Sequence, residues 1–190
     1  MGFTMYQSIN RWVFAGLLAG LGGCTHPDLK SYSTNKPNFI PEQFFEGQLT
    51  AHGVLKNRSG QVTRYFTADI DASWDKGVGT LAERFEFNDG EIQFRTWILK
   101  PQSEGQYVAT AGDVVGEGLA LTSGNAMKLD YVLRINYRGK PMNLEVEDWM
   151  WQVDEQTVIN HSILRKWGFR VGSIQLAIIK SDADKPDLPN

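Results

Sequence analysis

Apolar and polar residues alternate along the chain between residues 43 and 180, in runs of strand length. Such alternation predicts β-strands with one buried and one exposed face. Turn sequences rich in Asn, Asp and Gly, such as Asn88-Asp89-Gly90, separate the runs. The pattern predicts eight or nine strands and no helix. The expected strands are 43–56, 61–75, 78–88, 91–100, 106–122, 126–137, 141–153, 157–167 and 171–180.

Short turns between successive strands predict a single antiparallel β-barrel over residues 43–180, because closure removes exposed strand edges. A barrel of eight strands holds either a packed core or one small ligand. A β-sandwich is the alternative architecture. The tail, residues 181–190, carries three Asp and two Pro without periodicity and is expected to be disordered.

The first 23 residues are typical of a signal peptide. Arg11 precedes an apolar run over residues 12–21, which is too short to span a bilayer. The run ends in Leu21-Gly22-Gly23-Cys24, and Cys24 is the only cysteine. This sequence is similar to a bacterial lipobox, in which the cysteine becomes the acylated N-terminus. A plain secretory signal with an incidental cysteine is the alternative.

Acylation of Cys24 would anchor the chain to a membrane. Thr25, rather than Asp, follows the cysteine, which favours the outer membrane, with the domain facing the periplasm. Residues 24–42 carry Pro27, Pro37 and Pro41 among polar residues, and are expected to form a flexible tether.

Several ionisable side chains interrupt the apolar faces of the predicted strands. Reading Asp89-Gly90 as a two-residue loop opposes Phe85 to Phe94 on the inner face, and leaves Arg95 and Trp97 outside. On this reading Glu83 lies on the apolar face. Other runs place Arg64 and Asp148 on apolar faces too, and Asp113 is a further candidate within a glycine-rich stretch.

Buried charge is costly unless it is paired, so these groups should meet one another, a ligand or water. One interpretation is a structural network of arginine and carboxylates. The other is a polar patch in a cavity, where Arg64 holds a carboxylate or phosphate head and Trp74, Phe85 and Phe94 line the apolar part. A catalytic acid–base pair is a third possibility.

Composition excludes several other functions. With 19 Lys and Arg against 22 Asp and Glu, the net charge of −3 argues against nucleic-acid binding. The three histidines and single cysteine form no metal-binding motif, and no glycine-rich phosphate loop or Gly-x-Ser-x-Gly motif is present. We therefore expect no metal and no cofactor, and assign no catalytic residue.

The chain resembles a family of bacterial outer-membrane-type lipoproteins that contain a domain of unknown function. The resemblance covers about residues 44–180 and rests on short motifs such as Arg64-x-Phe66, Arg95-x-Trp97 and Asp148-Trp149-Met150. It implies a lipocalin-like, calycin-type barrel and brings no catalytic residue.

The expected function is that of an outer-membrane-anchored periplasmic lipoprotein. Its barrel would bind a small amphipathic or lipid-derived ligand, such as a fatty acid or phospholipid. One alternative is an enzyme acting on a fatty acyl or isoprenoid substrate, with Glu83 or Asp148 as general base. Another is an envelope module that binds a protein partner through exposed Trp97, Trp149 and Trp151.

Overall fold

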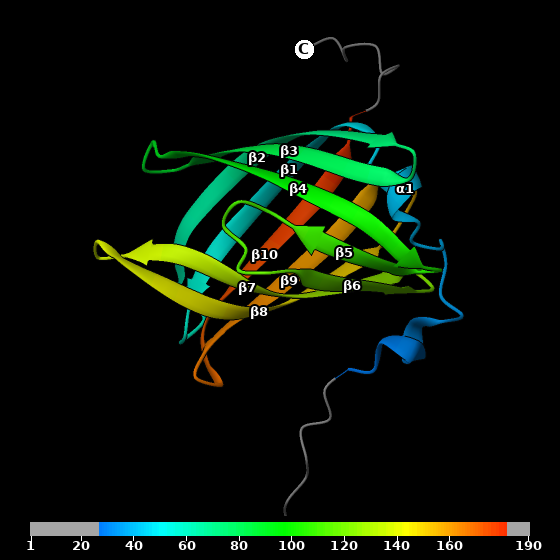
Figure 1. The fold of residues 1–190 in the computed structure, drawn as a ribbon. Coiled ribbons are helices and arrows are strands. Elements are labelled where there is room, and N and C mark those ends of the chain that lie inside the picture. Colours follow the sequence, from blue (N-terminus) through cyan, green and yellow to red (C-terminus); the bar gives the residue numbers. More distant parts are fainter. Residues whose placement is uncertain (1–26, 182–190) are drawn as a thin grey trace, which may run out of the picture.

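The chain folds as a closed antiparallel β-barrel in the computed structural model, which describes residues 27–181 (Figure 1). The predicted all-β barrel is confirmed, but it has ten strands rather than eight or nine. Around the barrel the strands follow the order β1-β10-β9-β8-β7-β6-β5-β4-β3-β2. They are β1 (Gly47–Asn57), β2 (Val62–Asp75), β3 (Val78–Phe87), β4 (Ile92–Ser103), β5 (Gln106–Thr110), β6 (Gly118–Ser123), β7 (Ala126–Tyr137), β8 (Lys140–Gln152), β9 (Thr157–Lys166) and β10 (Phe169–Lys180).

The additional strand arises because the stretch expected as one strand, 106–122, is split. Between β5 and β6 the chain leaves the ladder and runs beside β7, where Val114 forms a bridge with Leu133 and the Arg134 amide donates to the Asp113 carbonyl at 2.7 Å. Gly116 has a positive φ of 74°, which a strand does not accommodate. The loop therefore forms part of the barrel wall.

The turn between β3 and β4 corrects the predicted register. Residues 88–90 form a three-residue loop, closed by a bond of 2.9 Å from the Phe87 amide to the Glu91 carbonyl, with Gly90 at φ 85°. This offset of one residue turns every side chain of β4 to the opposite face. The inward position predicted for Phe94 is therefore wrong, because Phe94 lies outside and is 76% exposed. Arg95 and Trp97 point inward instead.

One end of the barrel is closed by the segment before β1. Phe39, Phe44 and Phe45 are buried there, and the rings of Phe44 and Phe45 meet edge to face at 5.2 Å. Two short helices, η1 (Leu29–Tyr32) and α1 (Pro41–Phe44), lie in this segment, on the right of Figure 1. Residues 39–45 thus pack against this end of the barrel, where Phe39, Phe44 and Phe45 form an apolar plug.

The outer wall carries a second contact of this segment. Tyr32 packs on Trp149 and Trp151, at 6.0 and 6.3 Å between ring centroids. Trp149 is buried beneath it, and Trp97 is buried on the inner side of the wall. The exposed surface expected from Trp97, Trp149 and Trp151 is therefore not formed, because two of the three rings are covered.

No helix among residues 27–181 is long and apolar enough to cross a membrane. The predicted signal peptide, Cys24 and the tail beyond residue 181 lie outside the described residues.

Candidate functional site

The barrel encloses a cavity of about 120 Å³. Strands β1, β2 and β10 contribute only apolar residues to its lining, whereas β3, β4, β7, β8 and β9 also contribute polar ones. The polar lining residues are Glu83, Arg95, Tyr131, Asp148, Asn160 and Ser162. The cavity is therefore amphipathic, with one polar and one apolar side.

Asp148 on β8 is held by two side chains from β9. Its Oδ1 atom accepts hydrogen bonds from Asn160 Nδ2 and from Ser162 Oγ, the latter at 2.8 Å. All three residues are buried. Burial raises the pKa of Asp148 to about 6, although the hydrogen bonds from Asn160 and Ser162 oppose the rise. A fixed carboxyl group thus faces the cavity and is ready to hold a proton near neutral pH.

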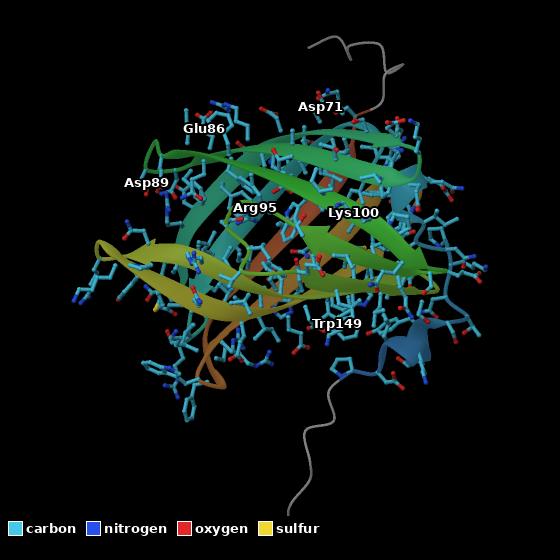
Figure 2. All side chains as sticks on the ribbon, in the orientation of Figure 1. Asp71, Glu86, Asp89, Arg95, Lys100 and Trp149 are labelled. Carbon is cyan, nitrogen blue, oxygen red and sulfur yellow. The ribbon has the colours of Figure 1, made fainter. Side chains whose placement is uncertain are left out.

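Arg95 on β4 forms an ion pair with Asp113 from the loop between β5 and β6. The guanidinium donates from Nη2 to Oδ2 at 2.7 Å and from Nε to both carboxylate oxygens at 3.0 and 3.1 Å. The two side chains are 21% and 36% exposed, so this pair lies where the cavity approaches solvent. Figure 2 shows Arg95 nearer the middle of the barrel than Asp89, which lies at its left end. The charge of Arg95 is largely satisfied by Asp113.

Glu83 on β3 is the cavity's unsatisfied group. Part of the residue is exposed, but its Oε2 atom is buried and accepts no hydrogen bond. Burial raises the pKa of Glu83 to about 7; the positive charge of Arg95 lowers it, and Asp113 and Asp148 add to the rise. A buried polar atom without a partner is rare in folded proteins, and this oxygen is free to accept a hydrogen bond from a ligand.

Tyr131 on β7 completes the polar side. Its ring meets Trp97 edge to face at 5.2 Å. Burial and the nearby charge of Asp148 raise the pKa of Tyr131, so its hydroxyl stays protonated and can donate a hydrogen bond. The cavity therefore presents the carboxyl groups of Glu83 and Asp148, the hydroxyls of Tyr131 and Ser162 and the amide of Asn160, besides the Arg95–Asp113 pair.

The structure brings four of the predicted residues to this site. Glu83, Phe85 and Asp148 line the cavity, and Asp113 reaches it through Arg95. Phe85 packs 5.5 Å from Phe66, another lining residue.

Arg64 and Trp74 lie elsewhere. Arg64 donates to Asp89 at 2.6 Å and to Glu91 at 2.8 Å at the rim of the barrel, with its guanidinium 3.8 Å from the centre of the Phe87 ring. Trp74 donates from Nε1 to the Phe45 carbonyl at 2.6 Å, and so belongs to the closed end. Neither lines the cavity.

Sequence reasoning misses four polar lining residues. Arg95 would be found by reading Asn88-Asp89-Gly90 as a three-residue loop. Tyr131 falls among the apolar residues of its strand, so alternation alone does not single it out. Asn160 and Ser162 alternate with apolar Val158 on the inner face of β9, a signal that a search for ionisable side chains alone does not register.

Among solved structures, this barrel is similar to the S-type phycobiliprotein lyase CpeS from Guillardia theta. That similarity has a TM-score of 0.56 at 14% identity, and covers 84% of this chain and 100% of the lyase. A second structure, from Bacteroides fragilis with a YmcC-like fold, has a TM-score of 0.29 at 12% identity, and covers 75% of this chain and 96% of that one. The likeness to the lyase shows a lipocalin-like barrel and nothing of activity.

No curated protein matches the sequence. A family model does match, over residues 18–180, and its description is "Protein of unknown function (DUF3833)". Because the match spans most of the 190 residues, the chain belongs to the DUF3833 family.

Proposed function

We propose that this protein binds a small amphipathic ligand inside the barrel. The observation that carries the proposal is the buried Oε2 atom of Glu83, which lacks a hydrogen-bond partner at the edge of a cavity. A ligand that donates a hydrogen bond to this atom would satisfy it, while the apolar residues of β1, β2 and β10 would cover the rest of the ligand.

The charges of the lining select the polar group of the ligand. Arg95 is paired with Asp113, so no cation among residues 27–181 forms an ion pair with Glu83 or Asp148. An anionic head would meet two carboxyl groups at close range, whereas an amine or a hydroxyl would supply the donor that Glu83 lacks. The proposed ligand is therefore a small amine or alcohol, lipid-derived or not, in preference to a free fatty acid.

The size of the cavity limits the ligand further. At about 120 Å³ it is smaller than the roughly 300 Å³ at which common ligand pockets begin. A whole phospholipid or long acyl chain exceeds this space. A short molecule, or the end group of a longer one, is the occupant that we propose.

The cellular location is part of the proposal. Leu21-Gly22-Gly23-Cys24 supports lipidation of Cys24, and Thr25 supports the outer membrane with the barrel facing the periplasm. The ligand would then be bound next to a membrane.

The test compares three molecules of equal length: butylamine, butanol and butyrate. Each is titrated into the full chain carrying Cys24→Ser, and binding is followed by calorimetry and by the rise in melting temperature. We expect the amine and the alcohol to bind more tightly than butyrate. Glu83→Gln should remove the preference for the amine over butyrate. Glu86→Gln, on the exposed face of the same strand, is the matched control. Preference for butyrate, or no binding of any of the three, would contradict the proposal.

A second function, acid–base catalysis on the bound ligand, is favoured by one observation. The pKa values of Glu83 and Asp148, raised by burial to about 7 and about 6, suit groups that exchange protons near neutral pH. Catalysis predicts that the wild-type chain converts a ligand that Glu83→Gln binds but leaves unchanged. Mass spectrometry of the recovered ligand distinguishes this from simple binding.

A further inference from the structure

Two neighbouring hairpins carry exposed aromatic side chains at their tips, at the end of the barrel away from the Phe39–Phe45 plug. Trp167 and Phe169 at the β9–β10 turn are 82% and 67% exposed, and Tyr137 at the β7–β8 turn is 51% exposed. The hairpins adjoin, because β8 pairs with β9 and Lys166 donates from Nζ to the Asn143 carbonyl at 2.8 Å. We call these three aromatic residues, together with Arg138, Lys166 and Arg170, the tip patch.

The turn geometry does not account for the tryptophan. Trp167 and Gly168 have φ values of 51° and 77°, as in the two-residue turn that favours Asn-Gly. A bulky residue at a positive φ is unfavourable, and this indole gains no burial in return. Packing within the barrel therefore does not explain a tryptophan at this position, and the exposed ring is available for a contact outside the barrel.

Positive charge surrounds these rings. Residues 134–143 contain three basic side chains and residues 166–170 contain two, Lys166 and Arg170, and neither stretch contains Asp or Glu. Lys166 Nζ lies 5.2 Å from the centre of the Trp167 ring, and Arg138 lies 5.2 Å from that of Tyr137. Neither cation, nor Arg170, forms an ion pair with a carboxylate among residues 27–181.

The β3–β4 hairpin at the same end differs. There Arg64 is neutralised by Asp89 and Glu91. The chain as a whole has a net charge of −3, so the basic tip patch is a local departure from its overall charge.

We propose that the tip patch docks on the surface of a bilayer containing anionic phospholipid. Tryptophan and tyrosine concentrate at the level of lipid headgroups, where their rings contact the acyl boundary and their polar atoms stay hydrated. Lysine and arginine beside them are attracted to the negative surface. Exposed aromatic rings with uncompensated cations match this surface better than an apolar protein groove, which would not select for the charge.

The experiment measures sedimentation of the full chain carrying Cys24→Ser, so that acylation does not contribute. The probes are vesicles of phosphatidylglycerol mixed with phosphatidylcholine, and vesicles of phosphatidylcholine alone, each at low and high salt. We expect binding to the mixed vesicles at low salt, weakened by high salt, and little binding to phosphatidylcholine. The double variant Trp167→Asn, Phe169→Thr should lose about tenfold or more in affinity. Its turn should form at least as readily as in the wild type, because Asn suits a positive φ.

The matched control removes two exposed aromatic residues elsewhere, Tyr65→Thr and Phe94→Thr, which are 59% and 76% exposed in the wild type. This variant should bind the mixed vesicles as the wild type does. Absence of binding to the mixed vesicles, equal binding to phosphatidylcholine, or an equal loss in both double variants would overturn the proposal. Self-association that depends on Trp167 without any vesicle binding would also overturn it, and would assign the patch to a protein contact.

Discussion

The most informative single residue in the barrel is a carboxyl group that the fold leaves unpaired. Glu83 lies beside Arg95, yet the guanidinium is turned to Asp113, so the charge of Arg95 offsets only part of the cost of burying the glutamate. Folded proteins seldom retain such an atom without a function, because an apolar side chain at this position would avoid the free-energy cost of burying an unpaired polar atom.

This residue should make the stability of the protein depend on pH. The pKa of Glu83 is raised from 4.5 to about 7 by burial, so the folded state holds its proton longer than the unfolded state does. The free energy of unfolding should therefore fall as pH rises from about 4.5 through 7, by up to about 3 kcal/mol. Glu83→Gln should remove this share of the dependence, as urea unfolding at about pH 5 and about pH 8 would reveal.

Asp148 contributes a decline of the same sign in both proteins, so their difference isolates Glu83. The exposed Glu86→Gln is the control and should follow the wild type. Parallel stability curves for the wild type and Glu83→Gln would mean that the glutamate is solvated in the folded state.

Alternation in the sequence is enough to find Glu83 and Asp148, because a charge on an apolar face stands out. It does not find Arg95, since a turn one residue longer than expected moves that arginine to the other face. Arg64 is found by the same alternation, yet it pairs with Asp89 and Glu91 at the rim of the barrel. It does so because it lies near the end of its strand, where an inward side chain reaches solvent. Position along the strand, as well as the face, decides what an inward charge does.

At the scale of elements, turns determine which face of each strand is buried. Gly90 sits at φ 85°, a conformation that costs other residues about 1 kcal/mol. Gly90→Ala should therefore lower the free energy of unfolding by about that amount. Gly112→Ala is the control, because Gly112 has no positive φ and has open space where a Cβ atom would lie, and it should leave stability unchanged or slightly higher. Equal effects in thermal unfolding would contradict this account of the turn.

The plug is the second element on which the fold depends. Phe44 is 2% exposed and packs against both Phe39 and Phe45. Phe44→Ala should lower the free energy of unfolding by about 3–5 kcal/mol, because it opens a void at the closed end of the barrel. Ile40→Ala, at a position 38% exposed in the same segment, should cost far less. Similar losses in urea unfolding would show that the segment is held by something other than its rings.

Strands are predictable at this scale and their interruptions are not. Period-two alternation locates most of the strands within a few residues. The loop between β5 and β6 is predicted as a strand because it contains apolar residues. It contains them because it packs against β7 as part of the barrel wall. The plug escapes prediction because proline and polar residues surround its phenylalanines.

At the scale of the whole molecule, the packing of residues 27–46 sets how far the barrel can lie from an anchor at Cys24. Asp28 accepts a hydrogen bond from the Lys30 amide, and Tyr32 is packed on the outer wall. The four residue steps from Cys24 to Asp28 reach about 14 Å at most when fully extended. A lipid on Cys24 would therefore hold the barrel close to the bilayer.

Fractionation of cells tests the anchor. The wild-type chain should remain with outer membranes after a wash in high salt, which removes proteins held by charge alone, because acyl chains do not respond to salt. Cys24→Ser should be released by the same wash. Retention of the variant after the wash would place the anchor elsewhere in the chain.

The seam between β1 and β10 has a consequence for biogenesis. Synthesis delivers residues 169–180 after the other nine strands, and until they arrive β1 and β9 each expose a row of unpaired amides and carbonyls. Nine strands can pair early with their sequence neighbours, but the ring cannot close until its two most distant strands meet. A nascent or truncated chain that ends before residue 169 is therefore an open sheet with two adhesive edges, which should make it the most aggregation-prone form of this protein and a natural client for chaperones.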